Sequence, residues 1–445
     1  MCVSNAVIES TGLEEQLSDL RAWLSVNWDP DLTVAEWWER LGLSGWAAPG
    51  LPTNAYGKGM ARTDAIQVQE EIVKFGALVA PAGLGALLAA PTIAACGTQA
   101  QIDVYVRDIV TGRKSWCQLF SEPQAGSDLA GVQTRAFKQD DEWIVNGQKV
   151  WTSTGQFADF GMLLARTDSA VPKHQGLSYF AFDMLQDGVE VRPLREMTGR
   201  AGFNEVFITD ARVSDSALIG GENNGWATAN ITLANERAGI GSGGRPAASG
   251  VMAPPGTVMG TLSRRAGDLT RPSEGSGGAR SESSGALSLM RDGADKLTAL
   301  ARMRGVNGDA GIRQDLARLY TLGELGRFNG LRAKAVRDQG GDIPGMANLA
   351  KLSMSQIVRQ TRDVGLRILG PSGMIHAYEV EGVTAPNGDP LSAAVTEMAL
   401  FAQGPSIYGG TDQVQRNIVG ERVLGLPKEP SNDRFTPFSQ LPKNA

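Results

Sequence analysis

The chain has 445 residues, of which 42% are hydrophobic and 20% are charged, and its formal net charge is −6 with a pI of about 5.3. A chain of this length and hydrophobic content can bury a sizeable core and suits two or three packed units. Its acidic balance argues against a protein that binds nucleic acid without sequence preference, because such a protein needs a basic face to displace the counterions of phosphates.

The first segment, residues 1–115, predicts a helical domain. Leu13, Leu17, Leu20 and Leu24 follow one another at helical spacing. The start of the chain is acidic where a secretory signal needs a basic segment and then an apolar one, so we expect no export signal and a cytoplasmic protein. The uncharged run 75–98 has the length of a membrane span. It is rich in Ala and Gly and is broken by two prolines, so we expect a packed loop and helix and no membrane contact.

The middle segment, residues 116–224, predicts a small β-domain. Runs such as EWIVNG, GMLLART and LSYFAFDM are rich in strand formers and are separated by turn residues. The dipeptide Asn146-Gly147 predicts a two-residue hairpin turn.

The last part, residues 225–430, predicts a C-terminal helical bundle of the four-helix type, because helical spacing returns and holds through 313–337 and 346–369. Within it, residues 241–288 are rich in Gly and Ser, and we expect a disordered or loosely packed insertion, since this composition buries little apolar surface. Residues 431–445 form a tail. The fold class predicted from this order is α+β.

The histidine and cysteine content argues against metal sites and against a serine-protease type of triad. With only His174 and His376, the chain has no plausible histidine metal cluster and no Ser-His-Asp triad. Its three cysteines share no metal-ligand spacing, and an odd number suits a reducing compartment. A glycine-rich dinucleotide fingerprint after a strand is also absent.

The stretch 119–131, LFSEPQAGSDLAG, predicts a ligand-binding loop. Pro123 fixes one backbone angle, Gly126 allows conformations closed to other residues, and short hydroxyl and acidic side chains lie beside exposed amides. An ordinary polar turn between two strands is the alternative interpretation of this composition.

This stretch resembles the flavin- and thioester-binding signature of the acyl-CoA dehydrogenase family. GQKVWTSTG (147–155), FNEVFITDARV (203–213) and IYGGTDQVQRNIVGERVLGLP (407–427) follow in the order and at roughly the spacing of that family. The resemblance runs from about residue 37 to 430 and fails between 241 and 287. It implies an acyl-CoA dehydrogenase-like fold with an N-terminal helical domain, a middle β-domain and a C-terminal four-helix bundle.

The resemblance also implies a flavoprotein with FAD as cofactor. The residues that match cofactor-binding positions are Phe120, Ser121, Ser127, Trp151, Ser153, Thr411 and Gln413. Those that match substrate-binding positions are Ser127, Arg237 and Tyr408. A core aromatic residue at a strand end is an equally good interpretation of Trp151 taken alone.

Many members of this family carry the catalytic glutamate directly after the tyrosine of the Ile-Tyr motif, but here Gly409 follows Tyr408. A minority, including enzymes that resemble isovaleryl- and long-chain acyl-CoA dehydrogenases, carries it on the first long helix of the third domain, in a Leu-x-x-Glu-Arg context. The run LANER places Glu236 and Arg237 in that context. Apolar neighbours on the same helix face would raise the pKa of Glu236 toward neutrality. A Glu-Arg pair on a helix surface is the alternative.

The reaction implied is FAD-dependent dehydrogenation of an acyl-CoA to a trans-2-enoyl-CoA, within fatty acid and lipid catabolism. Glu236 would be the base, and the backbone N–H of Gly409 would donate to the thioester oxygen. An electron-transfer flavoprotein would accept the electrons, and a homotetramer, a dimer or a hetero-oligomer is expected. A Phe-Gly motif that holds the neighbouring subunit's cofactor in the family is not recognisable, although Arg302 and Arg304 lie near that place. Oxidase or desulfinase chemistry, and a catalytically silent subunit, stay open as alternatives.

Overall fold

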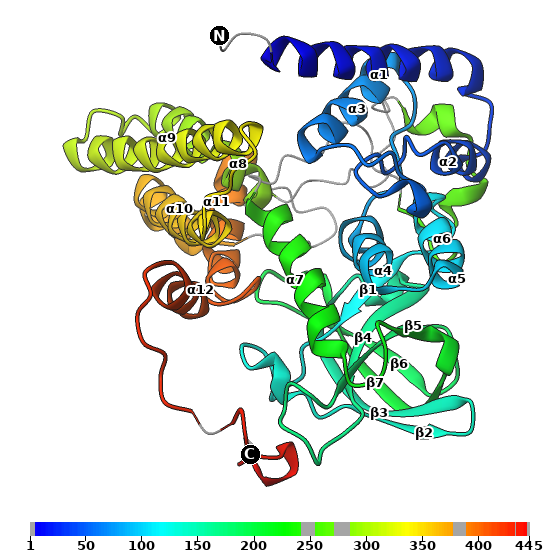
Figure 1. Cartoon of the computed structure of the whole chain (residues 1–445). Coiled ribbons are helices and arrows are strands. Elements are labelled where there is room, and N and C mark those ends of the chain that lie inside the picture. The colour runs from blue at the N-terminus through cyan, green and yellow to red at the C-terminus, as the bar shows by residue number, and fades with distance from the viewer. Residues whose placement is uncertain (1–4, 242–253, 271–284, 377–388, 432, 443–445) are drawn as a thin grey trace.

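The computed structural model describes the chain except residues 1–4, 242–253, 271–284, 377–388, 432 and 443–445. It has a group of helices at the N-terminal end, a mixed β-sheet in the middle and a second group of helices toward the C-terminal end (Figure 1). The predicted α+β class and the predicted order of the three units are confirmed.

The N-terminal unit packs around a tryptophan-rich core. The α2 helix begins with a capping box between Thr33 and Glu36, and the indole N–H groups of Trp37 and Trp38 donate to the carbonyls of Leu78 (2.7 Å) and Val79 (2.8 Å). No helix in the described ranges is both long and apolar enough to cross a membrane. The helices are α1 (Asn5–Asn27), α2 (Val34–Leu43), α3 (Arg62–Phe75), α4 (Ala90–Cys96), α5 (Gln99–Gln101) and α6 (Arg107–Val110).

The middle unit is an eight-stranded sheet in the order β6-β7-β3-β2-β4-β5-β8, with β1 paired to β4. Its strands are β1 (Trp116–Leu119), β2 (Arg135–Gln139), β3 (Glu142–Ser153), β4 (Phe160–Arg166), β5 (Leu177–Asp183), β6 (Val189–Leu194), β7 (Phe203–Ser214) and β8 (Leu218–Ile219). β4 and β5 are buried along almost their whole length, which explains their uninterrupted runs of apolar residues.

The hairpin expected at Asn146-Gly147 is wrong. Strand β3 continues through both residues, and the turn that joins it to β2 lies at Asp140, whose φ is 54°. The pairing of β3 with β7 shifts its register at Gly147, and a Cβ there would lie 2.3 Å from Thr134 Oγ1. The glycine therefore allows Thr134 to approach the strand closely at a bulge. A glycine in a strand can have this role without marking a turn.

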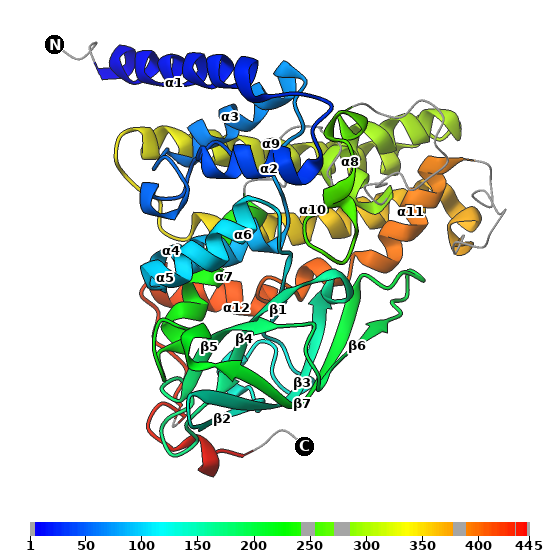
Figure 2. The same cartoon turned by 90° about the vertical axis from the view of Figure 1, so that its right-hand side faces the viewer.

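The C-terminal unit is helical. Four of its helices, α8 to α11, pack against one another around Leu297, Leu300, Val364 and Val395. Helix α7 runs from the sheet toward this bundle and toward the N-terminal helices (Figures 1 and 2). The helices are α7 (Gly225–Gly241), α8 (Gly285–Met303), α9 (Ala310–Asp338), α10 (Met346–Leu369), α11 (Pro390–Phe401) and α12 (Asp412–Ile418).

The expectation of a loosely packed insertion over 241–288 is wrong for residues 254–270. Ala266 and Leu269 are buried in the tryptophan-rich N-terminal core. The backbone joins it too, since Val34 N donates to Arg264 O and Ala266 N donates to Leu32 O, both at 2.8 Å. Averaging the composition over the whole stretch hid a short apolar segment. Residues 242–253 and 271–284 of the predicted insertion lie outside the described residues.

This packing makes a testable prediction for the 254–270 segment. Leu269→Ala should lower the free energy of unfolding by about 2 to 4 kcal/mol, because it leaves a cavity against the N-terminal core. Met259→Ala is the matched control, since Met259 is 42% exposed in the same segment and should cost little. Urea unfolding followed by tryptophan fluorescence measures both. Equal midpoints for the two variants would show that the segment does not contribute to the core.

Candidate active site

The loop 119–131 that follows β1 has a rigid base and an open tip. The side chain of Phe120 is buried and meets Tyr179 edge-on, with 6.0 Å between ring centroids. Glu122 and Ala125 exchange backbone hydrogen bonds of 2.9 and 3.0 Å and close a tight turn. Ser127 and Asp128, at the tip, are exposed.

A buried ion pair that the sequence did not reveal lies beneath the loop. The Lys149 Nζ donates to Glu122 Oε1 (2.8 Å) and to the carbonyls of Phe120 (3.1 Å) and Leu164 (2.8 Å), and its side chain is fully buried. Glu122 also accepts from the backbone N–H groups of Gln133 (2.6 Å) and Thr134 (2.9 Å). Burial alone would raise the pKa of Glu122, but the charge and hydrogen bond of Lys149 outweigh it and lower that pKa.

Trp151 lies on β3 in an unusual backbone conformation. Its φ is 59°, in the left-handed region, and its side chain is 60% exposed, with one edge against Phe203 at a centroid distance of 5.8 Å. Val150 N donates to Ser121 O (2.9 Å), so Trp151 lies next to the loop, and Ser153 ends the same strand half-buried. The strained backbone thus holds an exposed indole on the residue next to the one that bonds Ser121.

Helix α7 is fixed by a buried cluster of hydroxyl groups. Thr232 Oγ1 lies 2.9 Å from Thr92 Oγ1 on α4 and 3.3 Å from the Tyr179 hydroxyl on β5. At its N-terminal end, Gly225 approaches Ser178 so closely that a Cβ would lie 2.6 Å from the Ser178 backbone. Because Glu236 follows Thr232 by one helical turn, this cluster sets the position of its carboxylate.

Glu236 is half-buried and faces β1. Burial raises the pKa of its carboxyl, while a hydrogen bond with the Gln118 side chain and the charge of Arg237 pull the pKa the other way. Gln118 precedes Phe120 by two residues, so the carboxylate lies beside the start of the loop. Glu236 on α7 thus lies close to the start of the loop, and it does so through Gln118, a residue that the sequence analysis did not single out.

Tyr408 and Gly409 lie in a second cluster, before α12. Gly409 has a φ of 63°, and its carbonyl accepts from Gln415 Nε2 (2.8 Å), while Gln415 Oε1 accepts from Asn348 Nδ2 (2.6 Å). Burial raises the pKa of Tyr408 to about 12. Arg422, in the turn that follows α12, lies near α7, since its charge acts together with burial to lower the pKa of Arg237.

Thr411 and Gln413 lie at the start of α12. The Thr411 hydroxyl accepts from Val414 N (3.2 Å) and caps the helix, and Gln413 is exposed. Between them, buried Asp412 receives hydrogen bonds from Lys351 (3.2 Å) and Arg359 (2.8 Å) on α10. This anchor was not expected from the sequence, because an acidic residue in the first helical turn is ordinary.

Three further observations concern residues that the sequence analysis considered. Arg304 donates to Ser392 Oγ (2.9 Å) within its own helical bundle. Among the residues that the structure describes, no group of three or more His, Cys, Asp or Glu side chains could hold a metal ion. Cys96 and Cys117 form no disulfide.

Three family models match the chain. They describe the acyl-CoA dehydrogenase N-terminal domain (residues 15–113), middle domain (117–215) and C-terminal domain (281–424).

The matches to named relatives cover most of the chain. It is 32% identical over 396 residues to acyl-CoA dehydrogenase IpdE1 of Mycobacterium tuberculosis (strain ATCC 25618 / H37Rv), with 88% of each protein covered. It is 44% identical over 385 residues to acyl-CoA dehydrogenase FadE34 of the same organism, and this match covers 86% of the chain but 45% of that relative.

Solved structures show the same fold. The structure titled "Tcur3481-Tcur3483 steroid ACAD" has a TM-score of 0.66 at 23% identity, and the match covers 94% of this chain and 98% of that one. The ChsE4-ChsE5 complex from Mycobacterium tuberculosis has a TM-score of 0.60 at 24% identity, with 94% and 98% covered.

Proposed function

Because this chain belongs to the acyl-CoA dehydrogenase family, we propose that it removes the α- and β-hydrogens of an acyl-CoA thioester to give a trans-2-enoyl-CoA. The observation that carries this proposal is the half-buried carboxylate of Glu236 beside β1, with its pKa raised by burial. A carboxylate of this kind can accept a proton from a weakly acidic carbon at neutral pH. An electron-transfer flavoprotein is the proposed electron acceptor.

FAD is the proposed cofactor, and the residues of the site fit it. The exposed indole of Trp151 offers an aromatic face, and its neighbour Val150 bonds the Ser121 carbonyl, so this residue lies next to the loop that carries the predicted hydroxyl groups. FAD supplies the hydride acceptor for the β-carbon when it is bound. The residues that would hold it are Phe120, Ser121, Ser127, Trp151, Ser153, Thr411 and Gln413.

Glu236 is the proposed base and takes the α-proton onto a carboxylate oxygen. The N–H of Gly409 is the proposed donor to the thioester oxygen, which stabilises the negative charge that develops there. Ser127, Arg237 and Tyr408 would contact the rest of the thioester. Gly409 has no side chain, which leaves room near the acyl group and favours branched or ring-bearing acyl chains. The word "steroid" in one structural neighbour's title agrees with that preference.

The test is to purify the protein, record its visible spectrum and follow anaerobic flavin bleaching with straight, branched and ring-bearing acyl-CoAs. A yellow protein bleached by at least one of them supports the proposal. Turnover linked to oxygen would indicate an oxidase, and release of sulfite would indicate a desulfinase.

A catalytically silent subunit of a hetero-oligomer is the second candidate. Two observations favour it. The family's Phe-Gly motif is not recognisable in the sequence, and Arg304, which lies near that place, donates to Ser392 of its own chain. Two structural neighbours carry titles with paired protein names. Colourless protein that gains flavin only on mixing with a second chain would support it.

The raised pKa of Glu236 predicts how the rate depends on pH. A carboxyl with a raised pKa keeps its proton to higher pH, so the base is active only above that pKa and activity is lost as pH falls through it. The rate of flavin reduction should therefore rise about tenfold per pH unit on the acidic limb, with a midpoint above the ordinary carboxyl pKa of 4.5. Stopped-flow absorbance across pH measures it. A midpoint at or below that ordinary value would contradict a buried base.

A relocated base can be tested with the double variant Glu236→Ala, Gly409→Glu. If both positions face the same α-carbon, the new carboxylate should restore part of the lost rate. Recovery should be incomplete, because Gly409 has a φ of 63° and a residue with a Cβ is strained there. Straight acyl chains should recover better than branched ones, since the new side chain fills the space beside the acyl group.

The matched control is Glu236→Ala, Gly409→Gln, which has the same bulk without a base. Anaerobic flavin reduction is measured for each variant with one straight and one branched acyl-CoA. Equal rates for the Glu and Gln forms, in proteins that retain FAD, would show that the two positions do not share a target.

A further inference from the structure

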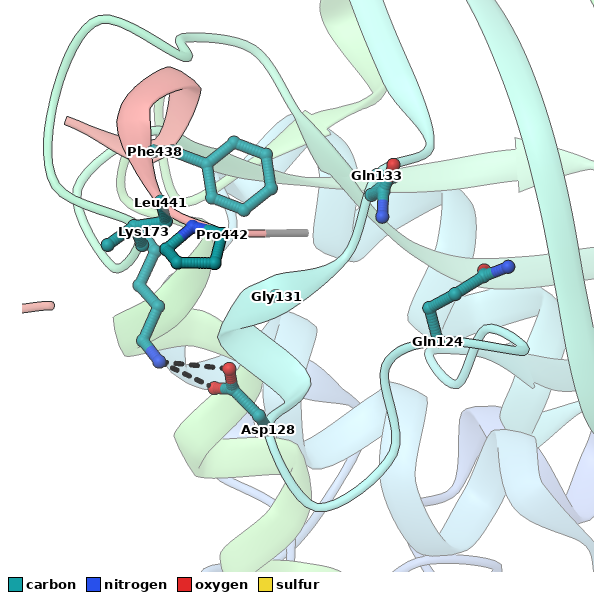
Figure 3. Close-up of a pocket in the computed structure, with 8 residues that line it drawn as sticks. All are labelled: Gln124, Asp128, Gly131, Gln133, Lys173, Phe438, Leu441 and Pro442. Atoms are coloured by element: carbon teal, nitrogen blue, oxygen red, sulfur yellow. Dashed lines mark hydrogen bonds and ion pairs between the residues drawn. The ribbon is translucent and has the colours of Figure 1, made fainter. Parts of the chain in front are cut away.

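The C-terminal segment 433–442 folds back onto the sheet, beside the loop 119–131 (Figures 1 and 3). Phe438 N donates to Val171 O and Ser439 N donates to Ser169 O, both at 2.9 Å, and Pro437 forms an antiparallel bridge with Pro172. These partners lie in the connection between β4 and β5. The segment is therefore held by its backbone at a defined register.

The Phe438 ring covers a cation that holds the end of the loop. The Arg166 guanidinium carbon lies 3.7 Å from the centroid of that ring. Arg166 is buried and donates to the carbonyls of Ala130 (2.5 Å), Val132 (3.3 Å) and Lys173 (2.6 Å). Phe438 thus shields from water the hydrogen bonds that fix the loop where it leaves its tip.

Lys173 links the same segment to the tip of the loop. Its Nζ lies 2.9 Å from both carboxylate oxygens of Asp128 and 2.5 Å from Asp433 Oδ2, and its side chain is only 9% exposed. Figure 3 shows the Lys173–Asp128 contact beside Phe438, Leu441 and Pro442, which line a cavity of about 50 Å³. Burial lowers the pKa of Lys173, but the hydrogen bonds with Asp433 and Asp128 outweigh it and raise that pKa. The ammonium therefore stays charged and joins the two carboxylates at neutral pH.

We infer that residues 433–442 are a clip that positions the loop 119–131, with Phe438 acting through Arg166 and Asp433 acting through Lys173. The clip makes no contact with Glu236 among the described interactions, so it acts on binding and leaves the bond-breaking step alone. Since Asp128 adjoins Ser127, fixing Asp128 lowers the entropy lost when the loop closes on a ligand. This functional consequence rests on the role in thioester binding proposed above for Ser127.

The test compares four variants of the full protein by hydrogen exchange and by steady-state kinetics. They are a chain ending at Pro430, Phe438→Ala, Asp433→Asn and the control Phe435→Ala. Phe435 lies in the same tail and is 84% exposed. The first three should exchange the backbone amides of 122–133 about tenfold faster and raise KM for acyl-CoA about tenfold, with kcat within about twofold. The control should change neither.

A synthetic peptide of residues 431–445 should restore slow exchange and low KM to the shortened chain, and the same peptide with Phe438→Ala should not. Unchanged exchange in Phe438→Ala and Asp433→Asn would overturn the clip. Faster exchange with unchanged KM would overturn its role in binding. The exchange measurement needs no substrate. It therefore shows whether the clip holds the loop even if no acyl-CoA reduces the flavin and the proposed function fails.

Discussion

Glu236→Gln should bind FAD and acyl-CoA like the wild-type protein but reduce its flavin about 10³ to 10⁴ times more slowly. The amide keeps the shape of the side chain and its contact with Gln118, but it cannot accept the α-proton. Because α7 is positioned by the Thr92, Thr232 and Tyr179 hydroxyl groups, which the change does not touch, folding should be preserved.

Anaerobic stopped-flow bleaching of the flavin measures this effect, with ligand affinity taken from the spectral shift on binding. Glu222→Gln is the matched control, since Glu222 is exposed just before α7 and should have no effect. Bleaching of Glu236→Gln at close to the wild-type rate would remove Glu236 from the mechanism and leave it as a structural residue.

Lys149→Met should lower the free energy of unfolding by about 3 to 5 kcal/mol, because it leaves the Glu122 carboxylate buried without its counter-charge. Its side chain is fully buried and that of Glu122 is 3% exposed, so water cannot replace the lost partner. Three hydrogen bonds that join β3 to β4 and to the loop are lost with the ammonium. Bound FAD should be lost as well, since the loop base supports Phe120 and Ser121.

Urea unfolding and flavin content measure these losses. The double variant Lys149→Met, Glu122→Gln should be more stable than Lys149→Met alone, because it leaves no unpaired charge. Lys138→Met is the control on the neighbouring strand, since Lys138 forms an exposed pair with Asp215 worth at most about 1 kcal/mol. A loss for Lys149→Met as small as that of Lys138→Met would contradict the importance of the buried pair.

The sequence was sufficient for the fold class, because long helical and strand patterns report directly on which faces are buried. Glu236 was selected because LANER resembles the Leu-x-x-Glu-Arg context of part of the family, and its role as the base stays a prediction. The structure adds the burial and the Gln118 contact of that carboxylate.

The sequence did not predict features that depend on contacts between residues far apart in the chain. Gly147 looks like a turn residue until Thr134 is seen against it. Ala266 and Leu269 look isolated in a Gly- and Ser-rich stretch until the N-terminal core is placed beneath them. Lys149 and Glu122 are separated by 27 positions, and nothing local indicates that their charges meet. Pairing across such distances is decided by topology, which local propensity does not contain.

With Trp151 in its proposed role beside FAD, the left-handed backbone of this residue sets stability against cofactor binding at a single position. A glycine would relax the φ of 59° at no steric cost, and little burial would be lost because the indole is 60% exposed. Selection for stability alone would therefore replace this tryptophan. A library screened only for soluble, heat-resistant protein should drift to glycine here, whereas one screened for retained yellow colour should keep the aromatic ring.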